Sequence, residues 1–343
     1  MKKPRSPHLT KPVKPFLVEP GLSTEETLSR MEHISFQGRN LAKAYQLWKT
    51  MLNDETFIFF GLAGALSAGG LRLLIGHLIE NRYIDCVVST GANLYHDLHE
   101  TRGGHHFIGS PDADDSILGQ DKIDRVYDTL IDEQEFIRND EWIADFSASL
   151  PIRRFTSREY LYRLGERLWG EYKSPGILTA AFRARVPIYC PAIADSSIGM
   201  GLSQGRILNV DSGLIDTIGD VQESAELVIM ADKTASIVIG GGTPKNFINQ
   251  ASVQAEYLDS RIQGHHYALQ IITDVPHYGG ASGSSLNEAK SWGKIRGAAK
   301  HVTVNADATI ALPILVTALA SSTPKPSDHR RLKTFTLDGE KLR

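Results

Sequence analysis

The segment TASIVIGGGTPKNFI, residues 234–248, carries the most information about the fold. It opens with TASIVI, a run of small and β-branched residues that is typical of a buried strand. Three glycines, Gly240 to Gly242, follow directly, and a helical stretch begins near residue 245. A strand, a glycine-rich turn and a helix in this order predict one unit of a parallel sheet.

The same alternation extends in both directions along the chain. Further strand-like runs are TFIFFG at 56–61, IDCVVST at 84–90, VPIYCP at 186–191, YALQIIT at 267–273 and HVTVNA at 301–306. Helical stretches near 211–231, 245–262 and 307–321 lie between or after them. Because the apolar runs are continuous, the strands should be buried on both sides. We therefore expect an α/β fold with a parallel sheet covered by helices on both faces.

The chain divides into a tail, one domain and a second tail. We expect a Pro- and Lys-rich tail over 1–22, one domain over 23–325 and a C-terminal tail over 326–343. Ser23 and Glu26 fit a capping box, which predicts a helix from there to about Met51. Residues 120–185, including DKIDRVYDTLI and SREYLYRLGERLWGEY, look mostly helical and predict an insertion or cap on the sheet.

Composition excludes several classes of function. Hydrophobic residues make up 41% and charged residues 22% of the 343 residues, and the formal charge is -3. We therefore expect a soluble protein that binds neither nucleic acid nor a membrane. Cys86 and Cys190 lie in strand-like runs, so two buried thiols in a reducing cytoplasm are expected in preference to a disulfide.

Small residues follow four of the predicted strands. They are GLAGALSAGG in the 60s, STGANLYHD at 89–97, Gly240 to Gly242, and NADA at 305–308. Such residues let a backbone approach a phosphate, and the next helix offers free N–H groups there. Asp307 would suit a ribose hydroxyl or a helix cap. None of these turns has the pattern G-x-G-x-x-G, but together they indicate a nucleotide site.

The segment HYGGASGSSLNEAKSWGKIRG, residues 277–297, admits two interpretations. It could be a surface loop followed by an ordinary lysine. Alternatively, Lys294 stands beside an aromatic wall, Trp292, and near a carboxylate, Glu288. A desolvated lysine has a lowered pKa, and its neutral amine can form a Schiff base.

Four segments of the sequence resemble segments of a known protein family. NEAKSWGKI at 287–295 resembles the active-site motif of deoxyhypusine synthases, and NADATIALPILV, IVIGGGTPKNFI and CPAIADSSIG resemble other segments of that family. The similarity covers residues 25 to 320, and the chain is identified as a member of the bacterial deoxyhypusine synthase-like branch. The resemblance implies a Rossmann-like fold, a homotetramer with active sites at subunit interfaces, and bound NAD. It also implies transfer of an aminobutyl group from spermidine, through an imine on a lysine, to an acceptor amine.

The resemblance assigns roles to individual residues. Lys294 matches the imine-forming lysine, Trp292 the wall beside the donor, and Glu288 an acidic residue of the donor pocket. The implied NAD-contacting set is Thr90, Gly91, Asp195, Gly241, Gly242, Thr273, Ser282 and Asp307.

Departures from the family gather in the amine pocket. Asn246 replaces a catalytic histidine, His96 a glutamate, and Met200, Tyr278 and Ala281 replace aspartates. Losing buried carboxylates weakens binding of an ammonium group. We therefore expect the same chemistry with altered substrates, such as putrescine, spermidine or agmatine, and a product of the homospermidine type.

Three functions compete at this point. The first is a transferase with a small-amine acceptor. The second is a true deoxyhypusine synthase that modifies a lysine of the hypusine-carrying translation factor. The third is a non-enzymatic NAD-binding scaffold, against which the retained Lys294 argues. The histidines of HDLHETRGGHH lack a complete ligand pattern, so no metal is expected.

Overall fold

The computed structural model describes residues 9–54, 56–208, 213–322, 337–338 and 341–342. Its centre is a six-stranded sheet in the order β11-β10-β9-β1-β2-β7, with every neighbouring pair parallel. The strands are β1 (Phe57–Leu62), β2 (Cys86–Ser89), β7 (Ile188–Tyr189), β9 (Thr234–Ile239), β10 (His265–Ile272) and β11 (Ile295–Asn305). In chain order this is 6-5-4-1-2-3, the doubly wound dinucleotide-binding arrangement, and the predicted α/β fold is confirmed.

Each face of the sheet has its own core, as strand β1 shows. Phe57 and Phe59 point to one face and pack with residues of α10 and α11. Ile58, Phe60 and Leu62 point to the other face and join a larger core with α2, α3 and α12. The alternation follows from the two-residue period of a strand, and both sets are buried because helices cover both faces.

The helices on and beside the sheet have definite bounds. They are α1 (Thr24–Met31), α2 (Phe36–Asn53), α3 (Arg72–Glu80) after a π-helical turn at Ser67–Leu71, α4 (Gly91–Thr101), α8 (Ile177–Ala184), α10 (Thr217–Met230), α11 (Gly242–Leu258) and α12 (Ala308–Ser322). Between β10 and β11 the chain makes three short 3-10 turns, Pro276–Tyr278, Ala281–Gly283 and Glu288–Lys290.

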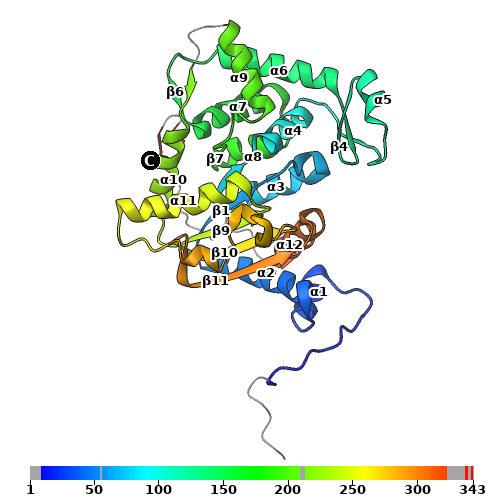
Figure 1. The fold of residues 1–343 in the computed structure, drawn as a ribbon, viewed down its shortest axis with the longest axis vertical. Helices are drawn as coiled ribbons and strands as arrows, with labels where there is room; N and C mark the ends of the chain where they lie inside the picture. The colour runs from blue at the N-terminus through cyan, green and yellow to red at the C-terminus, as the bar shows by residue number, and fades with distance from the viewer. Residues whose placement is uncertain (1–8, 55, 209–212, 323–336, 339–340, 343) are drawn as a thin grey trace, which may run out of the picture.

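A second group of elements between residues 107 and 215 lies at the top of Figure 1. They are β3 (Phe107–Ile108), α5 (Asp115–Gln120), β4 (Ile123–Val126), β5 (Thr129–Asp132), α6 (Glu133–Ala148), β6 (Arg154–Phe155), α7 (Ser157–Tyr172), α9 (Ser197–Leu208) and β8 (Leu214–Ile215). The predicted helix at SREYLYRLGERLWGEY is confirmed as α7. The bounds predicted for the domain, its insertion and its tails stay predictions.

Two of the expected helices were wrong. DKIDRVYDTLI forms the antiparallel pair β4–β5, because its Val, Thr and Ile residues favour strands and Tyr127 turns the chain at φ 55°. The helix expected from Ser23 to Met51 is interrupted after Met31. The predicted capping box at Ser23 is present, but Ser35 is extended and starts a second helix.

Beyond the helices, the ends of the chain are only partly described. Residues 9–23 form no helix or strand, and Figure 1 shows them running away from the body. The predicted C-terminal tail lies mostly outside the described residues. The strands there, β12 (Leu337–Asp338) and β13 (Lys341–Leu342), pair with each other.

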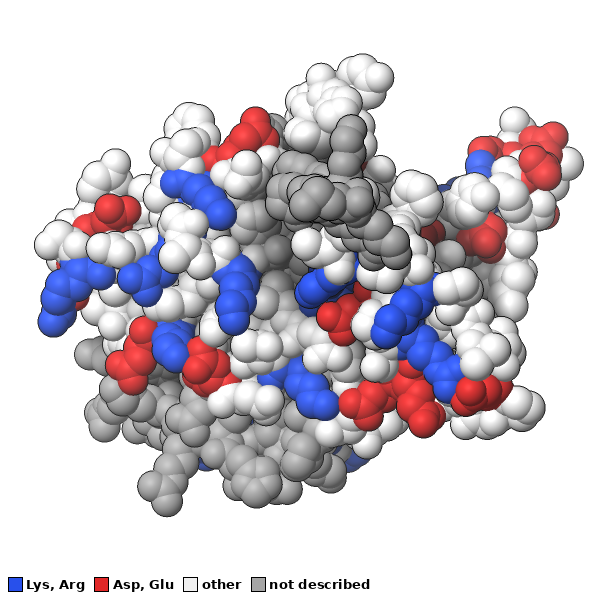
Figure 2. Space-filling view, turned by 90° about the horizontal axis from the view of Figure 1, so that it is seen from below, with Lys and Arg blue, Asp and Glu red and all other residues white. Residues whose placement is uncertain are grey.

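The surface and the cysteines agree with the composition. Among described residues on the face in Figure 2, Lys and Arg are interspersed with Asp and Glu, without a continuous basic patch. No helix within the described ranges is long and apolar enough to cross a bilayer. Cys86 and Cys190 are buried free thiols, as expected, and burial raises the pKa of both.

Candidate active site

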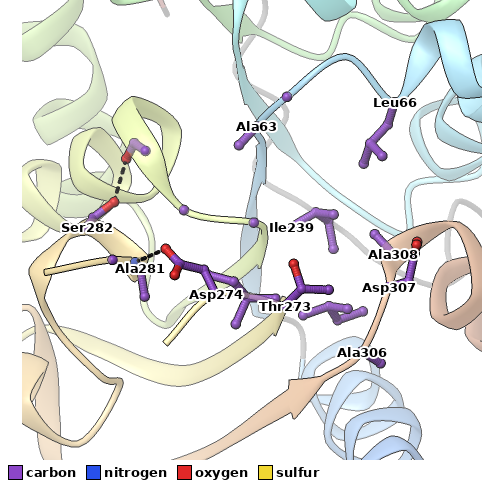
Figure 3. Close-up of a pocket in the computed structure, with 17 residues that line it drawn as sticks. Ala63, Leu66, Ile239, Thr273, Asp274, Ala281, Ser282, Ala306, Asp307 and Ala308 are labelled. Carbon is purple, nitrogen blue, oxygen red and sulfur yellow. Dashed lines mark hydrogen bonds between the residues drawn. The ribbon is translucent and has the colours of Figure 1, made fainter. Parts of the chain in front are cut away.

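A pocket of about 460 Å³ opens at the carboxyl edge of the sheet. Its walls are the segments that follow β1, β9, β10 and β11, so it spans the point between β1 and β9 where the strand order reverses. Doubly wound sheets bind their ligands at this place. Figure 3 shows Ala63 and Leu66 above the cavity, Ser282 and Ala281 on one side, and Asp307 and Ala308 on the other.

The glycine turn after β9 allows the backbone to form one wall. Gly240 and Gly242 have φ of 81° and 60°, in the region that favours glycine. A Cβ at Gly240 would also lie 3.1 Å from the Cβ of Ala63. The sequence GGG is therefore needed to bring α11 back against the sheet beside the pocket.

Two helix N-termini face this pocket. Helix α11 begins at Gly242, and its N-cap Gly241 provides no side-chain cap, so the first backbone N–H groups remain available to a ligand. Helix α12 begins beside Asp307, whose Oδ1 accepts hydrogen bonds from the backbone and side chain of Thr309, both at 2.7 Å. These bonds lower the pKa of Asp307 and leave Oδ2 for a ligand hydroxyl. The uncapped terminus of α11 suits a phosphate group, and the Asp307 carboxylate at the start of α12 suits a ribose.

The loop after β10 closes the remaining side. Asp274 accepts a hydrogen bond from the backbone N–H of Ala281 at 2.6 Å, and Ser282 donates to the carbonyl of Gly242 at 3.0 Å (Figure 3). A Cβ at Gly280 would lie 2.2 Å from the Asp274 carboxylate, so this loop requires glycine there. Asp274 was missed in the sequence, where only its position directly after a strand could have indicated it.

The structure brings five of the eight predicted NAD-contacting residues together. Gly241, Gly242, Thr273, Ser282 and Asp307 all line the pocket.

The other three lie on the same edge of the sheet but outside the pocket. Thr90 donates to the carbonyl of Gly64, a lining residue, at 2.7 Å. Gly91 starts α4, where a Cβ would clash with Ser196, and Asp195 is exposed in the loop after β7.

The residues predicted for the imine chemistry lie on a different surface. Lys294 is half-buried directly before β11, with its Nζ 5.5 Å from the centre of the Trp292 ring. Trp292 is 67% exposed, and Glu288 is exposed at the start of a 3-10 turn, where Oε2 accepts from the backbone N–H of Ser285. None of these three is among the described residues that line the 460 Å³ pocket.

Lys245, which the sequence reasoning missed, connects the two surfaces. Its side chain is buried, and its Nζ donates to the carbonyl oxygens of Ala281 and Ser284, each at 2.6 Å. Burial and the charge of Lys294 lower the pKa of Lys245 to about 8, and Glu288 opposes this. The sequence did contain one indication that Lys245 is buried. It lies three residues before Ile248, on the apolar face of the helix α11.

A second carboxylate lies near Lys294. A Cβ built at Gly293 would be 3.0 Å from Oε2 of Glu256, an exposed residue near the end of α11. Glu256, from α11, and Glu288, from the 3-10 turn, thus place two carboxylates beside the segment that carries Lys294. The sequence could not have indicated that Glu256 lies near Lys294, because its spacing in the helix is that of an ordinary solvent-exposed residue.

The remaining predicted pocket residues are scattered. Ala281 lines the pocket, Asn246 is exposed on the first turn of α11, Tyr278 is 91% exposed, and Met200 is 57% exposed on α9. His96 is buried on α4, with its Nδ1 2.8 Å from Nε2 of His106.

The histidine cluster is a hydrogen-bonded network. Nδ1 of His106 lies 2.6 Å from Oε1 of Glu100, and His99 contacts Asn139 and the carbonyl of His105. Burial, with the neighbouring histidines, lowers the pKa of His96 to about 4. Within the described part of the chain, no group of three or more His, Cys, Asp or Glu side chains is arranged to hold a metal ion.

Comparison with known proteins agrees with this geometry. The family model for deoxyhypusine synthase matches residues 26–319. A "probable deoxyhypusine synthase 2" of Archaeoglobus fulgidus is 46% identical over 290 residues, 84% of this chain and 95% of the relative. The relative of the same name from Methanosarcina acetivorans is 45% identical over 303 residues, 88% of both chains.

A bacterial relative and a solved structure extend the comparison. A "deoxyhypusine synthase-like protein" of Coxiella burnetii is 40% identical over 293 residues, 84% of this chain and 83% of that one. A crystal structure from Entamoeba histolytica with the deoxyhypusine synthase name has 19% identity and a TM-score of 0.59, covers 89% of this chain and 96% of that one, and shows the shared fold. Because the family model spans most of the sequence, the chain belongs to the deoxyhypusine synthase family of aminobutyl-transferring enzymes.

Proposed function

We propose that this protein uses NAD to move an aminobutyl group from a polyamine to a small amine, through an imine on Lys294. The proposal rests on two features that occur in one chain. A pocket lies where the strand order of the sheet reverses, and Lys294 lies beside the ring of Trp292. The pocket fits a dinucleotide: the uncapped N-terminus of α11 faces it, and one oxygen of Asp307 is available for a ribose hydroxyl.

When bound, NAD would accept a hydride from the carbon next to the donor's secondary amine and later return it. The chain's own residues do the rest. The amine of Lys294 attacks the oxidised donor and holds the aminobutyl group as an imine, and the diamine product leaves. Trp292 forms a flat wall beside the group, and Glu288 and Glu256 attract its distal ammonium. The acceptor amine then displaces Lys294, whose amine is regenerated.

Because one subunit places Lys294 outside its own pocket, we propose that a second subunit completes each active site in a homotetramer. The exposure of Trp292 and Tyr278, 67% and 91%, supports this, because large aromatic side chains are usually covered in assemblies. The buried free thiols and the absence of a membrane-spanning helix in the described residues support a cytoplasmic location.

Subunit complementation tests the shared site. Lys294→Ala is mixed and refolded with Gly241→Val, which fills the pocket wall next to Ala281 and Ser282. If lysine and pocket come from different subunits, a random mixture recovers roughly a quarter of wild-type activity, because half the pairs contain one intact site. If both come from one subunit, activity stays at the level of the separate variants.

The acceptor separates two candidate functions. A small-amine acceptor is favoured by Met200, Tyr278 and Ala281, which replace carboxylates expected from the family resemblance. A protein acceptor, the translation-factor lysine, is favoured by the relatives named deoxyhypusine synthase at 45–46% identity. Family membership argues against a non-enzymatic scaffold.

Trapping tests the function directly. The protein is incubated with NAD and one donor (spermidine, putrescine or agmatine), reduced with borohydride and weighed intact. We expect an NAD-dependent aminobutyl adduct on Lys294, and product analysis with each acceptor then identifies the acceptor. No adduct with any amine, in protein that binds NAD, would refute the imine mechanism.

A further inference from the structure

A second pocket, of about 410 Å³, lies at the amino edge of the sheet, opposite the first. It is lined by the end of α2, by residues before and at the starts of β9 and β10, and by residues 296–300 of β11. The proposed transfer chemistry does not use it.

A bulge in the edge strand makes the cavity. The pairing of β11 with β10 passes from Ile295–His265 directly to Lys300–Tyr267, so residues 296–299 oppose the single residue His266. A bulge leaves backbone groups without ladder partners, and bulges concentrate beside functional sites. In this protein the bulged residues 296–299 of the edge strand β11 form one wall of the pocket.

The pocket carries an excess of positive charge. Three cations line it, Lys233, Arg296 and Lys300, against one carboxylate, Asp54. Asp54 is already engaged, because Oδ1 accepts from Lys233 at 2.7 Å and Oδ2 from the Tyr267 hydroxyl at 2.6 Å. No carboxylate within the described ranges lies in ion-pair distance of Arg296 or Lys300.

Neutral partners hold the Arg296 guanidinium in place. One terminal nitrogen lies 2.5 Å from Nε2 of His266, and the other donates to Oε1 of Gln263 at 3.1 Å. Burial, Arg296 and Lys233 lower the pKa of His266, which therefore stays neutral. The guanidinium is thus oriented without being neutralised, which is the state that suits an incoming anion.

We propose that this pocket binds a small phosphate-bearing anion, with Arg296, Lys300 and Lys233 supplying the charge. A phosphate dianion balances the net excess of two positive charges, and the cavity has room for a group larger than the phosphate itself. The proposal is independent of the transfer reaction.

The test uses the full chain with NAD present, so that the first pocket is filled. Inorganic phosphate and, separately, ribose 5-phosphate are titrated at constant ionic strength set with chloride. Thermal unfolding gives the affinity, and hydrogen exchange locates the site. We expect protection confined to residues 263–267 and 295–300. Tighter binding of ribose 5-phosphate would identify a phosphate ester as ligand, and tighter binding of inorganic phosphate the free ion.

Matched variants test whether phosphate binds in this pocket. Arg296→Gln and Lys300→Gln should each weaken phosphate binding about tenfold, whereas Lys43→Gln, on an exposed position of α2, should not. Gly297→Asp adds a carboxylate to the pocket, at a position where a Cβ meets no atom within 4 Å. Because the new negative charge repels phosphate, this variant should abolish binding. Gly297→Ala is its control for folding. The proposal is overturned if chloride alone reproduces the thermal shift, if Gly297→Asp binds like Gly297→Ala, or if protection appears at residues 240–242 instead.

Discussion

The pocket at the carboxyl edge and the Lys294 surface both use the segment between β10 and β11, but they differ in completeness. The pocket is enclosed by four strand ends and held by hydrogen bonds such as Asp274 to Ala281. The Lys294 surface has an aromatic wall that is 67% exposed and acids that face solvent. Backbone and glycine can complete a pocket within one subunit, whereas the proposed transfer at Lys294 would need a second surface to cover these exposed side chains.

Removing the reactive amine gives the largest expected effect. Lys294→Ala should lower turnover by at least about 1,000-fold and abolish the borohydride adduct, because the proposed mechanism holds the imine on this amine. NAD affinity, measured by calorimetry, should be unchanged, because Lys294 lies outside the pocket. Lys290→Ala, on the preceding 3-10 turn, is the control. A large loss of NAD affinity in Lys294→Ala would show that Lys294 belongs to the cofactor pocket, in its own subunit or across an interface, and the complementation of Lys294→Ala with Gly241→Val would distinguish the two.

Lys245→Met should affect both regions together, by a smaller factor. The variant keeps the volume but leaves the carbonyls of Ala281 and Ser284 without their donor, at a cost of about 2 kcal/mol in the free energy of unfolding. The loosened loop should weaken NAD binding and slow adduct formation, each about tenfold. If only the NAD affinity or only the rate of adduct formation fell, Lys245 would not couple the two regions.

Lys245 also predicts a pH dependence. Its pKa in the native protein, about 8, is below the ordinary 10.5, so the native state loses this proton before the unfolded chain does. Stability from this group therefore rises as pH increases from about 8 toward 10.5. The difference in unfolding free energy between wild type and Lys245→Met should widen over that range. A constant difference in urea denaturation would contradict the lowered pKa.

More of the residues predicted for a cofactor than of those predicted for the amine lie together in the structure, for a physical reason. A strand, a glycine turn and a helix are local patterns, so the unit around Gly240 could be placed before the structure was known. Lys245, Asp274 and Glu256 gain their roles from contacts across the fold, which periodicity does not reveal. The β4–β5 hairpin was mistaken for a helix because a short alternating run fits both patterns.

The glycine turn tests the cofactor region alone. Gly240→Ala places a Cβ at φ 81° and 3.1 Å from Ala63, which should cost about 1–2 kcal/mol of stability. The displaced turn should weaken NAD binding by about fivefold. In contrast, Gly119→Ala, where a Cβ meets no atom within 4 Å, should change neither quantity. If Gly240→Ala bound NAD like the wild type, the pocket at the carboxyl edge would not be the cofactor site.

The smallest effect is expected at His96, which the family resemblance assigns to the amine pocket and the structure places in a buried network with His106. Its native pKa of about 4 lies below the ordinary 6.5, so the unfolded chain binds this proton more readily. Stability from His96 is therefore lost as pH falls from 6.5 toward 4, and His96→Gln should reduce that loss. If the network is only structural, turnover at pH 8 should change by less than about twofold. A larger fall in turnover with unchanged stability would mean that His96 reaches the substrate, and the amine region would then extend from Lys294 to α4.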